Sequence, residues 1–191
     1  PMAGSEKTGY ENSTDHLLEN AYYVITPTKE TTREQIERMR GIAKAIGAIP
    51  MVLDYREHDY AVAAISHLPH LIASSLVNLV RDNDSPEGIM KQMAAGGFKD
   101  ITRIASSSPV MWQNICLTNQ REILHLLDLY LEKLQTFRTE LANADSENLL
   151  AEFQSAKDYR DNLPIHQPGI LPSVYEFYCD LIDEAGGIAT I

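Results

Sequence analysis

The chain has 191 residues, of which 44% are hydrophobic and 23% are charged, and its formal net charge at pH 7 is -11. This composition is typical of a globular protein and excludes a disordered one, because the apolar side chains suffice to form a core. The strong negative charge argues against nucleic acid and against an anionic membrane surface as partners. An anionic ligand would therefore need a local cluster of positive side chains.

The apolar segments and the cysteines place the protein in the cytoplasm. The longest apolar run, residues 60–80, contains two histidines, a proline and several serines, so we expect neither a membrane span nor a signal peptide. Cys116 and Cys179 lack the spacing of metal ligands and are expected to be reduced thiols.

The first predicted elements form a strand-helix-strand unit. Residues 20–28 are rich in aromatic and β-branched side chains and predict a strand, and residues 49–53 predict a second one. Between them, Thr31 and Glu34 have capping-box spacing, apolar residues follow at helical intervals, and Gly47 ends the helix. A βαβ unit implies a parallel sheet, so we expect residues 1–56 to be the C-terminal part of an α/β domain.

From residue 57 onward the pattern is helical. A long apolar helix is expected over residues 59–81, bent at Pro69, because proline lacks a backbone donor. Ser85-Pro86 and Ser108-Pro109 each predict a helix start. Apolar residues recur at steps of four and three over residues 123–141, a helix long enough for a bundle or a subunit interface. A further helix is expected to be capped by Asp145 or Ser146.

The predicted fold class is mainly α. An all-helical domain at residues 57–163 follows the βαβ part at residues 1–56. Residues 164–172 are rich in proline and predict a linker, and residues 173–191 predict a strand and a turn.

The stretch GGFKDITRIASSSPVMW, residues 96–112, is the best candidate for a binding element. Gly96 and Gly97 are expected to end the preceding helix and to admit a ligand close to the backbone. Lys99 and Arg103 are four residues apart and project from one side of a helical turn, while Asp100 can hold the guanidinium of Arg103. This pattern favours a small anionic organic ligand; the alternative is a surface helix with an ordinary Asp-Arg pair.

The histidines leave three alternatives open. His58 and Asp59 are adjacent, and His67 and His70 lie three residues apart on one helix face. They could bind a metal ion, they could be buried and satisfied by hydrogen bonds, or they could line a ligand cleft. No GxGxxG, P-loop, GxSxG or catalytic cysteine signature is present in the sequence, so no cofactor-binding residue is assigned.

Three segments together resemble the prephenate dehydrogenase family: PMAGSEKTG at residues 1–9, HDYAVAAISHLPH at 58–70, and the stretch at 96–112. The resemblance implies a Rossmann domain that binds NAD, with NADP as the alternative, and an all-helical domain that forms a homodimer. It also implies a reaction of tyrosine biosynthesis, the oxidative decarboxylation of prephenate to 4-hydroxyphenylpyruvate.

The resemblance also implies roles for individual residues. Arg103 would bind the ring carboxylate, and His70 would contact the pyruvyl side chain. Glu6 would pair with Arg103 and gate access. The other implied substrate-site residues, some reaching across from the neighbouring subunit, are Ser5, His67, Gly96, Lys99, Asp100, Met111 and Trp112.

The catalytic histidine of this family would stand immediately before Pro1, so no catalytic residue is expected within the chain and no metal is implied. Residues 173–191, ending in IDEAGGIATI, resemble the start of an ACT domain, a module that would sense tyrosine. Two other functions remain as alternatives. One is a catalytically silent dimerisation fragment that binds anions at Arg103. The other is a helical metal-dependent hydrolase that uses His58, Asp59, His67 and His70.

Overall fold

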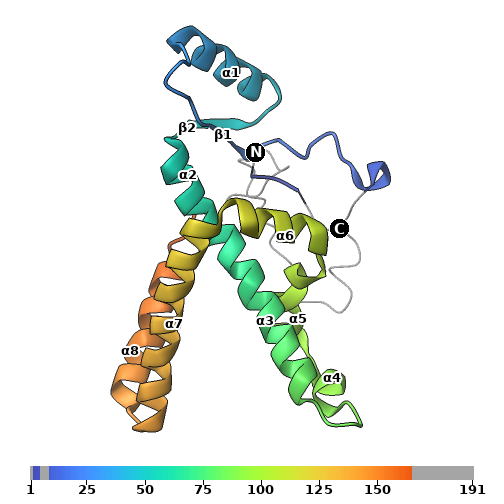
Figure 1. The fold of residues 1–191 in the computed structure, drawn as a ribbon, viewed down its shortest axis with the longest axis vertical. Helices are drawn as coiled ribbons and strands as arrows, with labels where there is room; N and C mark the ends of the chain where they lie inside the picture. Colours follow the sequence, from blue (N-terminus) through green and yellow to red (C-terminus); the bar gives the residue numbers. More distant parts are fainter. Residues whose placement is uncertain (1, 5–8, 165–191) are drawn as a thin grey trace, which may run out of the picture.

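A computed structural model describes residues 2–4 and 9–164 of the chain (Figure 1). Ser5, Glu6 and Cys179 lie outside the described residues. The predicted linker, apart from its first residue, and the ACT-like segment lie outside them as well.

The first part of the chain is the predicted βαβ unit. Strands β1 (Tyr22–Ile25) and β2 (Ile49–Val52) pair in parallel, and helix α1 (Arg33–Ala45) connects them. A short 3-10 turn, η1 (Tyr10–Asn12), precedes β1. The N–H of Met2 donates to the carbonyl of Tyr22 at 2.8 Å. Successive carbonyls of a strand point to opposite edges, and the carbonyl of Ala21 accepts from Ile49 in β2. Met2 therefore lies along the other edge of β1.

The capping box of α1 is one residue later than its predicted position. Thr32 is the N-cap, its hydroxyl accepts from the N–H of Gln35, and the side chain of Gln35 accepts from the N–H of Thr32. Thr31 instead accepts a hydrogen bond from the N–H of Thr28, which closes the preceding turn. Helix α1 ends as predicted, because Gly47 adopts a left-handed φ of 77°.

Three helical segments follow one another without a break. Helix α2 (Tyr55–Val62) leads into a π-helical turn η2 (Ala63–His67) and then into α3 (Leu68–Asn83). The sequence predicted a bend at Pro69; the structure has a π turn just before this residue. The N–H of Leu68 bonds back to Ala63, five residues earlier, and Pro69 has no N–H to bond in the next position.

Helix α4 (Ile89–Met93) starts later than the Ser85-Pro86 signal predicted. The residue that caps it is Asp84, whose carboxylate accepts the N–H groups of Met90 and Lys91 at 2.8 and 3.0 Å. The intervening residues form a turn instead of the first helical turn.

Gly96 and Gly97 begin helix α5 (Gly96–Thr102), whereas the sequence predicted that they end the helix before them. Arg103 follows in the 3-10 turn η3 (Arg103–Ser106). The preceding helix, α4, ends at Met93, close to the predicted position. The prediction was therefore wrong about the role of the two glycines and nearly right about where α4 ends.

The last three helices agree with their predictions. Helix α6 (Pro109–Thr118) is capped by the hydroxyl of Ser108, and α8 (Ser146–Asp161) by the carboxylate of Asp145. Between them lies α7 (Gln120–Ala142), the long amphipathic helix.

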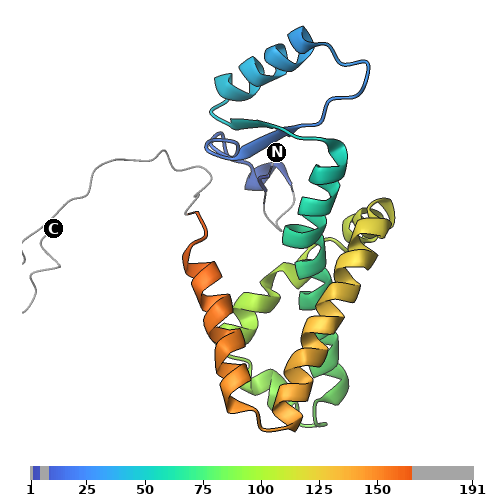
Figure 2. The same ribbon diagram turned by 90° about the vertical axis from the view of Figure 1, so that its left-hand side faces the viewer.

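The helical part opens into two diverging arms, one made by α3 with α4 and α5, the other by α7 with α8 (Figures 1 and 2). The arms meet where η2 packs against α7, around the buried side chains of Ala63, Leu68, Ile123 and Leu126. The βαβ unit lies at the opposite end of the molecule from the tips of the arms. Many large apolar side chains of the helices are exposed in the single chain, among them Leu79, Ile101, Leu131, Leu141 and Phe153.

The continuous helical run Tyr55–Asn83 is 29 residues long and is apolar enough, by length and composition alone, to cross a membrane. The sequence argument that residues 60–80 are too polar for a span is therefore not upheld by this criterion. Central helices of water-soluble proteins meet the same criterion. This run carries a π turn and Pro69, and it buries Ala63, Leu68 and Ala73 against other helices.

Candidate functional site

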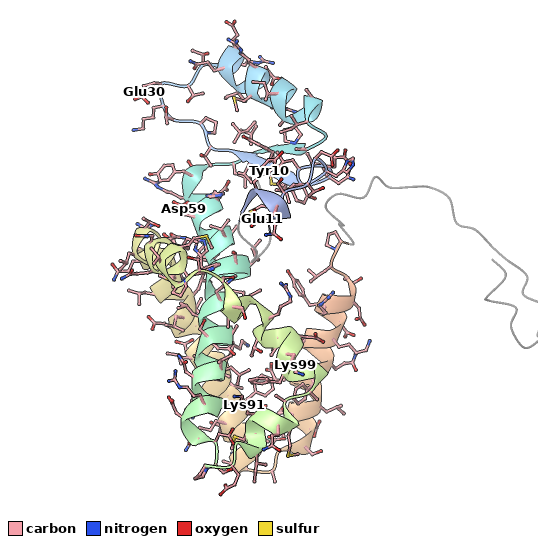
Figure 3. The ribbon with its side chains drawn as sticks, turned by 90° about the vertical axis from the view of Figure 1, so that its right-hand side faces the viewer. Tyr10, Glu11, Glu30, Asp59, Lys91 and Lys99 are labelled. Atoms are coloured by element: carbon pink, nitrogen blue, oxygen red, sulfur yellow. The ribbon has the colours of Figure 1, made fainter. Side chains whose placement is uncertain are left out.

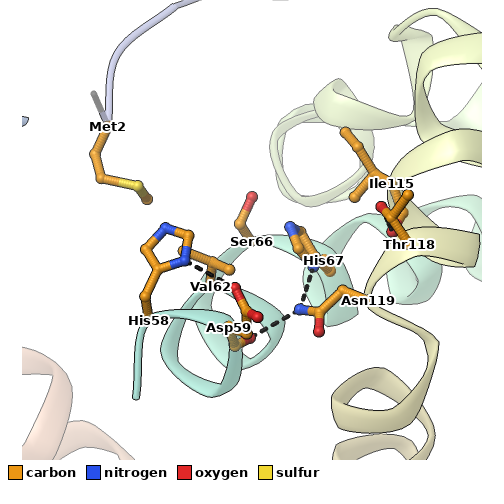
Figure 4. A pocket seen from close by; sticks show the side chains of 9 residues that line it. All are labelled: Met2, His58, Asp59, Val62, Ser66, His67, Ile115, Thr118 and Asn119. Carbon is orange, nitrogen blue, oxygen red and sulfur yellow. Dashed lines mark hydrogen bonds and ion pairs between the residues drawn. The ribbon is translucent and has the colours of Figure 1, made fainter. Parts of the chain in front are cut away.

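Two hollows flank the junction of the arms. The first, which we call the His67 hollow, has a volume of about 510 Å³ (Figure 4). The second, the His70 hollow, has a volume of about 160 Å³. The His67 hollow is lined by Met2, His58, Asp59, Val62, Ser66, His67, Ile115, Thr118 and Asn119. The His70 hollow is lined by His70, Leu71, Ser74, Ile104, Ala105, Ser107, Pro109, Trp112 and Cys116.

The His67 hollow lies where the βαβ unit meets the helices. Met2 comes from the segment along β1, while His58 and Asp59 belong to α2 and His67 ends the π turn. The Nδ1 of His58 lies 2.9 Å from the carboxylate of Asp59. The side-chain amide of Asn119 links the backbone carbonyl of Asp59 to the ring of His67, at 2.8 and 3.3 Å. The wall of this hollow is thus polar and hydrogen-bonded.

The His70 hollow is built around an aromatic stack. The rings of His70 and Trp112 are nearly parallel, at an angle of 21°, with their centroids 3.3 Å apart. The Nδ1 of His70 lies 3.1 Å from the carbonyl of Ser66, and its Nε2 lies 3.5 Å from the hydroxyl of Ser107. Trp112 also meets the edge of the His67 ring, so this single tryptophan contacts both histidines.

The two histidines line different hollows. The π turn ends at His67, and His70 lies three residues later in α3. His67 lines one hollow and His70 the other, and the ring of Trp112 contacts both.

Burial and neighbouring charges lower the pKa values of both histidines, which favours their neutral form. Burial, followed by the proximity of His58 and His70, lowers the pKa of His67, although Asp59 opposes this shift. Burial likewise lowers the pKa of His70; the bond to the carbonyl of Ser66 opposes the shift, and the charge of Arg103 adds to it. Neutral imidazoles can donate one hydrogen bond and accept another, which suits the binding of a polar organic molecule.

We expect acid to destabilise this fold through His67 and His70. Their pKa values in the folded protein lie below the ordinary value of 6.5. The unfolded chain therefore binds more protons, and stability falls as the pH decreases from about 6.5 through the folded pKa values. Thermal melts between pH 8 and pH 5 should show this loss, and replacing both histidines by glutamine should reduce it.

His16→Gln is the control, because Glu19 and Asp15 raise the pKa of His16. Its contribution to stability has the opposite sign: it is present at low pH and lost as the pH rises through the raised pKa. A melting temperature with the same acid dependence in the parent and in the double glutamine variant would contradict this account.

The predicted binding stretch is only partly brought into the site. Arg103 is exposed, but η3 packs against α3, and the guanidinium acts electrostatically on His70. Lys99 lies on α5, well along the arm from Asp59 on α2 (Figure 3). Lys99, Asp100, Gly96 and Met111 are exposed within the single chain and line neither hollow.

Gly96 makes no close backbone approach within the described residues, since a Cβ atom there would meet no heavy atom within 4 Å. The Nε1 of Trp112 is buried and has no hydrogen-bond partner in the part of the chain that the structure describes.

The three alternatives for the histidines can now be compared. Within residues 2–4 and 9–164, no three side chains of His, Cys, Asp or Glu gather as metal ligands would. The metal-dependent hydrolase therefore receives no support. His67 and His70 are partly buried, hydrogen-bonded and cleft-lining at once, so the other two alternatives both describe them.

Sequence reasoning missed Asn119 and Ser107. Asn119 stands at the junction of α6 and α7, where it is the C-cap of one helix and the N-cap of the next. An asparagine between two predicted helices is a recognisable capping signal, but its long-range partners lie 52 and 60 residues away in sequence. Ser107 is one of three consecutive serines, and nothing local distinguishes it.

Comparison with known proteins gives two family matches along the chain. Residues 54–155 match the family described as "Prephenate dehydrogenase, dimerization domain". Residues 1–52 match the family described as "Prephenate dehydrogenase, nucleotide-binding domain". The two matches meet at the start of α2, between the βαβ unit and the helices.

Individual relatives agree with these matches. The chain is 41% identical over its whole length to a prephenate dehydrogenase of Bacillus subtilis and 34% identical to one of Lactococcus lactis, and it spans 52% of each. The chain thus spans about half the length of these curated relatives. Its fold is similar to that of prephenate dehydrogenase from A. aeolicus in complex with hydroxyphenyl propionate and NAD+. The TM-score is 0.81 at 31% identity, covering 86% of this chain and 57% of the other.

Proposed function

The chain belongs to the prephenate dehydrogenase family, and we propose that the whole protein oxidatively decarboxylates prephenate to 4-hydroxyphenylpyruvate with NAD+ as the hydride acceptor. The observation that carries this proposal is the arrangement of His67 and His70 around Trp112, with the charge of Arg103 acting on His70. Hydrogen-bonding imidazoles beside a cation suit a substrate with one carboxylate on its ring and another on a pyruvyl side chain.

We assign the substrate contacts from this arrangement. Arg103 binds the ring carboxylate, because its planar guanidinium matches a carboxylate with two parallel hydrogen bonds. His70, whose Nδ1–H donates to the carbonyl of Ser66 and whose ring stacks on Trp112, contacts the pyruvyl side chain. The further contacts that the family resemblance implies, from either subunit, are those of Ser5, Glu6, His67, Gly96, Lys99, Asp100 and Met111.

The proposed reaction balances as follows. The ring carbon that bears the hydroxyl loses a hydride to NAD+, and the hydroxyl proton leaves to a base, for which the family resemblance implies a histidine immediately before Pro1. The ring carboxylate then departs as carbon dioxide, and its bonding electrons make the ring aromatic. A proton taken up by the phenolate oxygen completes 4-hydroxyphenylpyruvate. We propose that the indole of Trp112 and the apolar side chains of the His70 hollow limit the access of water to this path.

The described residues fit a dinucleotide cofactor. Parallel strands β1 and β2 form part of a sheet whose carboxyl ends lead toward α2, the edge at which open α/β sheets bind ligands. The His67 hollow joins Met2 of this part to the histidines of the helices. NAD+, when bound, would accept the hydride. We propose NAD rather than NADP as the cofactor. We also propose a cytoplasmic location, without a membrane or nucleic acid partner.

We propose the same domain organisation that the sequence predicts: a nucleotide-binding part at residues 1–56, a helical dimerisation part at 57–163, a linker at 164–172, and the start of a tyrosine-sensing ACT domain at 173–191. The homodimer is supported by the match to a dimerization domain and by the apolar side chains exposed on both arms. A second copy would cover these side chains, which removes apolar surface from water.

Leu131→Asp should weaken or abolish dimerisation. The side chain of Leu131 is 54% exposed on α7, in the stripe that predicts a subunit interface. A carboxylate buried there without a partner is strongly unfavourable. Sedimentation velocity over a range of concentrations measures the effect. Lys133→Asp, on the opposite face of α7, is the control and should leave the dimer intact; equal dissociation constants for parent and Leu131→Asp would exclude this face from the interface.

The proposed activity is tested with the protein produced at the length that its own gene encodes. NADH should form only when both prephenate and NAD+ are present, with one carbon dioxide released per NADH. Prephenate binding without turnover would instead favour the catalytically silent dimerisation fragment.

A further inference from the structure

The amide of Asn119 is held in one orientation by the backbone. Its Nδ2 donates to the carbonyl oxygen of Asp59 at 2.8 Å (Figure 4). A carbonyl oxygen only accepts hydrogen bonds, so the opposite amide orientation would place two oxygens against each other. The NH2 group of Asn119 must therefore face Asp59.

This orientation determines the tautomer of His67. The same NH2 group lies 3.3 Å from the Nδ1 of His67 and has a second hydrogen to donate. The Nδ1 must then be the acceptor, and the proton of the neutral imidazole must reside on Nε2. A protonated imidazole would place an Nδ1–H against the amide N–H, which is unfavourable.

The remaining ring nitrogen faces the hollow. In Figure 4 the second nitrogen of His67 lies on the side of the ring away from Asn119, beside Ser66. His67, Ser66 and Asn119 all line the His67 hollow. An Nε2–H there is a hydrogen-bond donor available to an oxygen atom of a molecule in the hollow.

We propose that Asn119 is a positioning residue that holds His67 in the Nε2–H tautomer, so that His67 donates a hydrogen bond to a carboxylate or hydroxyl oxygen of the substrate. The tautomer follows from the geometry alone; the identity of the acceptor as a prephenate oxygen rests on the proposed function. The Asp59 carbonyl orients the Asn119 amide, and this amide in turn orients the His67 ring. Asn119 is 60 residues from Asp59 and 52 residues from His67 in the sequence.

The charged neighbours of His67 are consistent with this role. His58 and Asp59 of α2 pair with each other at 2.9 Å, and His70 of α3 is neutral on the other side of Trp112. At the start of α7, Arg121 pairs with Glu122. Burial and the two neighbouring histidines lower the pKa of His67, which favours the neutral ring.

The direct test is nitrogen NMR of the protein labelled with ¹⁵N-histidine, with His67 assigned from the spectrum of His67→Gln. The parent should show His67 as the Nε2–H tautomer near neutral pH. In Asn119→Asp, the carboxylate accepts instead of donating, so the His67 proton should move to Nδ1 and its pKa should rise above that of the parent. Asn114→Asp is the control, because the Asn114 amide bonds only to its own helix at Val110 among the described residues.

The Nδ1–H tautomer in the parent would overturn the proposal, whether or not the Asn119 variants fold. An unchanged tautomer and pKa in a folded Asn119→Asp protein would overturn it as well. Kinetics add a separate readout: Asn119→Leu should raise KM for prephenate by roughly threefold to tenfold, as expected for one lost hydrogen bond, with a smaller change in kcat. Absence of any prephenate oxidation in the parent would refute the proposed function while leaving the NMR result to decide the role of Asn119.

Discussion

Replacing Arg103 by alanine should lower kcat/KM for prephenate by roughly a hundredfold. This factor lies within the loss of about 2–4 kcal/mol in binding free energy that we expect when a charge pair loses one partner. The reason is that the ring carboxylate of the substrate would lose the two parallel hydrogen bonds and the positive charge that the guanidinium supplies. Most of the loss should be seen as a higher KM, because the contact exists before and during the reaction. Steady-state kinetics with NAD+ in excess measures it.

Two variants sharpen this prediction. Arg103→Lys keeps the charge but not the planar pair of donors, so it should recover only part of the loss. Arg81→Ala is the matched control: Arg81 lies on α3, is exposed, and pairs with the adjacent Asp82. Arg81→Ala should leave kcat/KM within about twofold of the parent. An Arg103→Ala enzyme with unchanged KM would remove Arg103 from the substrate site.

Ile123→Ala should be the most damaging truncation in the core, lowering the free energy of unfolding by about 2–4 kcal/mol. The side chain of Ile123 is 4% exposed and packs with Ala63, Leu68 and Leu126 where the arms meet. Its loss would leave a cavity beneath the π turn that positions His67. Urea unfolding at fixed protein concentration gives the magnitude.

Lys133→Ala is the control for this experiment, because it truncates an exposed side chain on the face of α7 opposite the proposed subunit interface. Its cost should be clearly smaller. Equal losses in the two variants would mean that the core does not lie where the arms meet. A lower kcat/KM in folded Ile123→Ala would further indicate that packing at this point supports the site.

The parts of the fold set by local signals could be predicted from sequence. Gly47, Ser108 and Asp145 end or begin helices where expected, because caps depend on residues one turn apart. The register of a cap is harder when two candidates are adjacent: Thr31 and Thr32 can both cap, and only the hydrogen bonds of Gln35 distinguish them.

Features that depend on distant contacts could not be predicted in this way. The π turn before Pro69 and the capping of α4 by Asp84 each involve hydrogen bonds with unusual spacing. In the candidate site, His67 and His70 could be selected from their spacing, but their division between two hollows depends on which distant residues, such as Asn119 and Ser107, pack against each ring. The role proposed for Asn119 depends on partners from another part of the chain.

The most direct test of the proposed function follows one hydrogen atom. Prephenate deuterated at the ring carbon that bears the hydroxyl is supplied with NAD+ to the protein at its natural length, and the reduced nicotinamide is analysed by mass spectrometry. We predict one deuterium in each molecule of reduced cofactor and one carbon dioxide for each deuterium transferred. Reduced cofactor without deuterium, or no reduced cofactor at all, would contradict the assignment of this protein as a prephenate dehydrogenase.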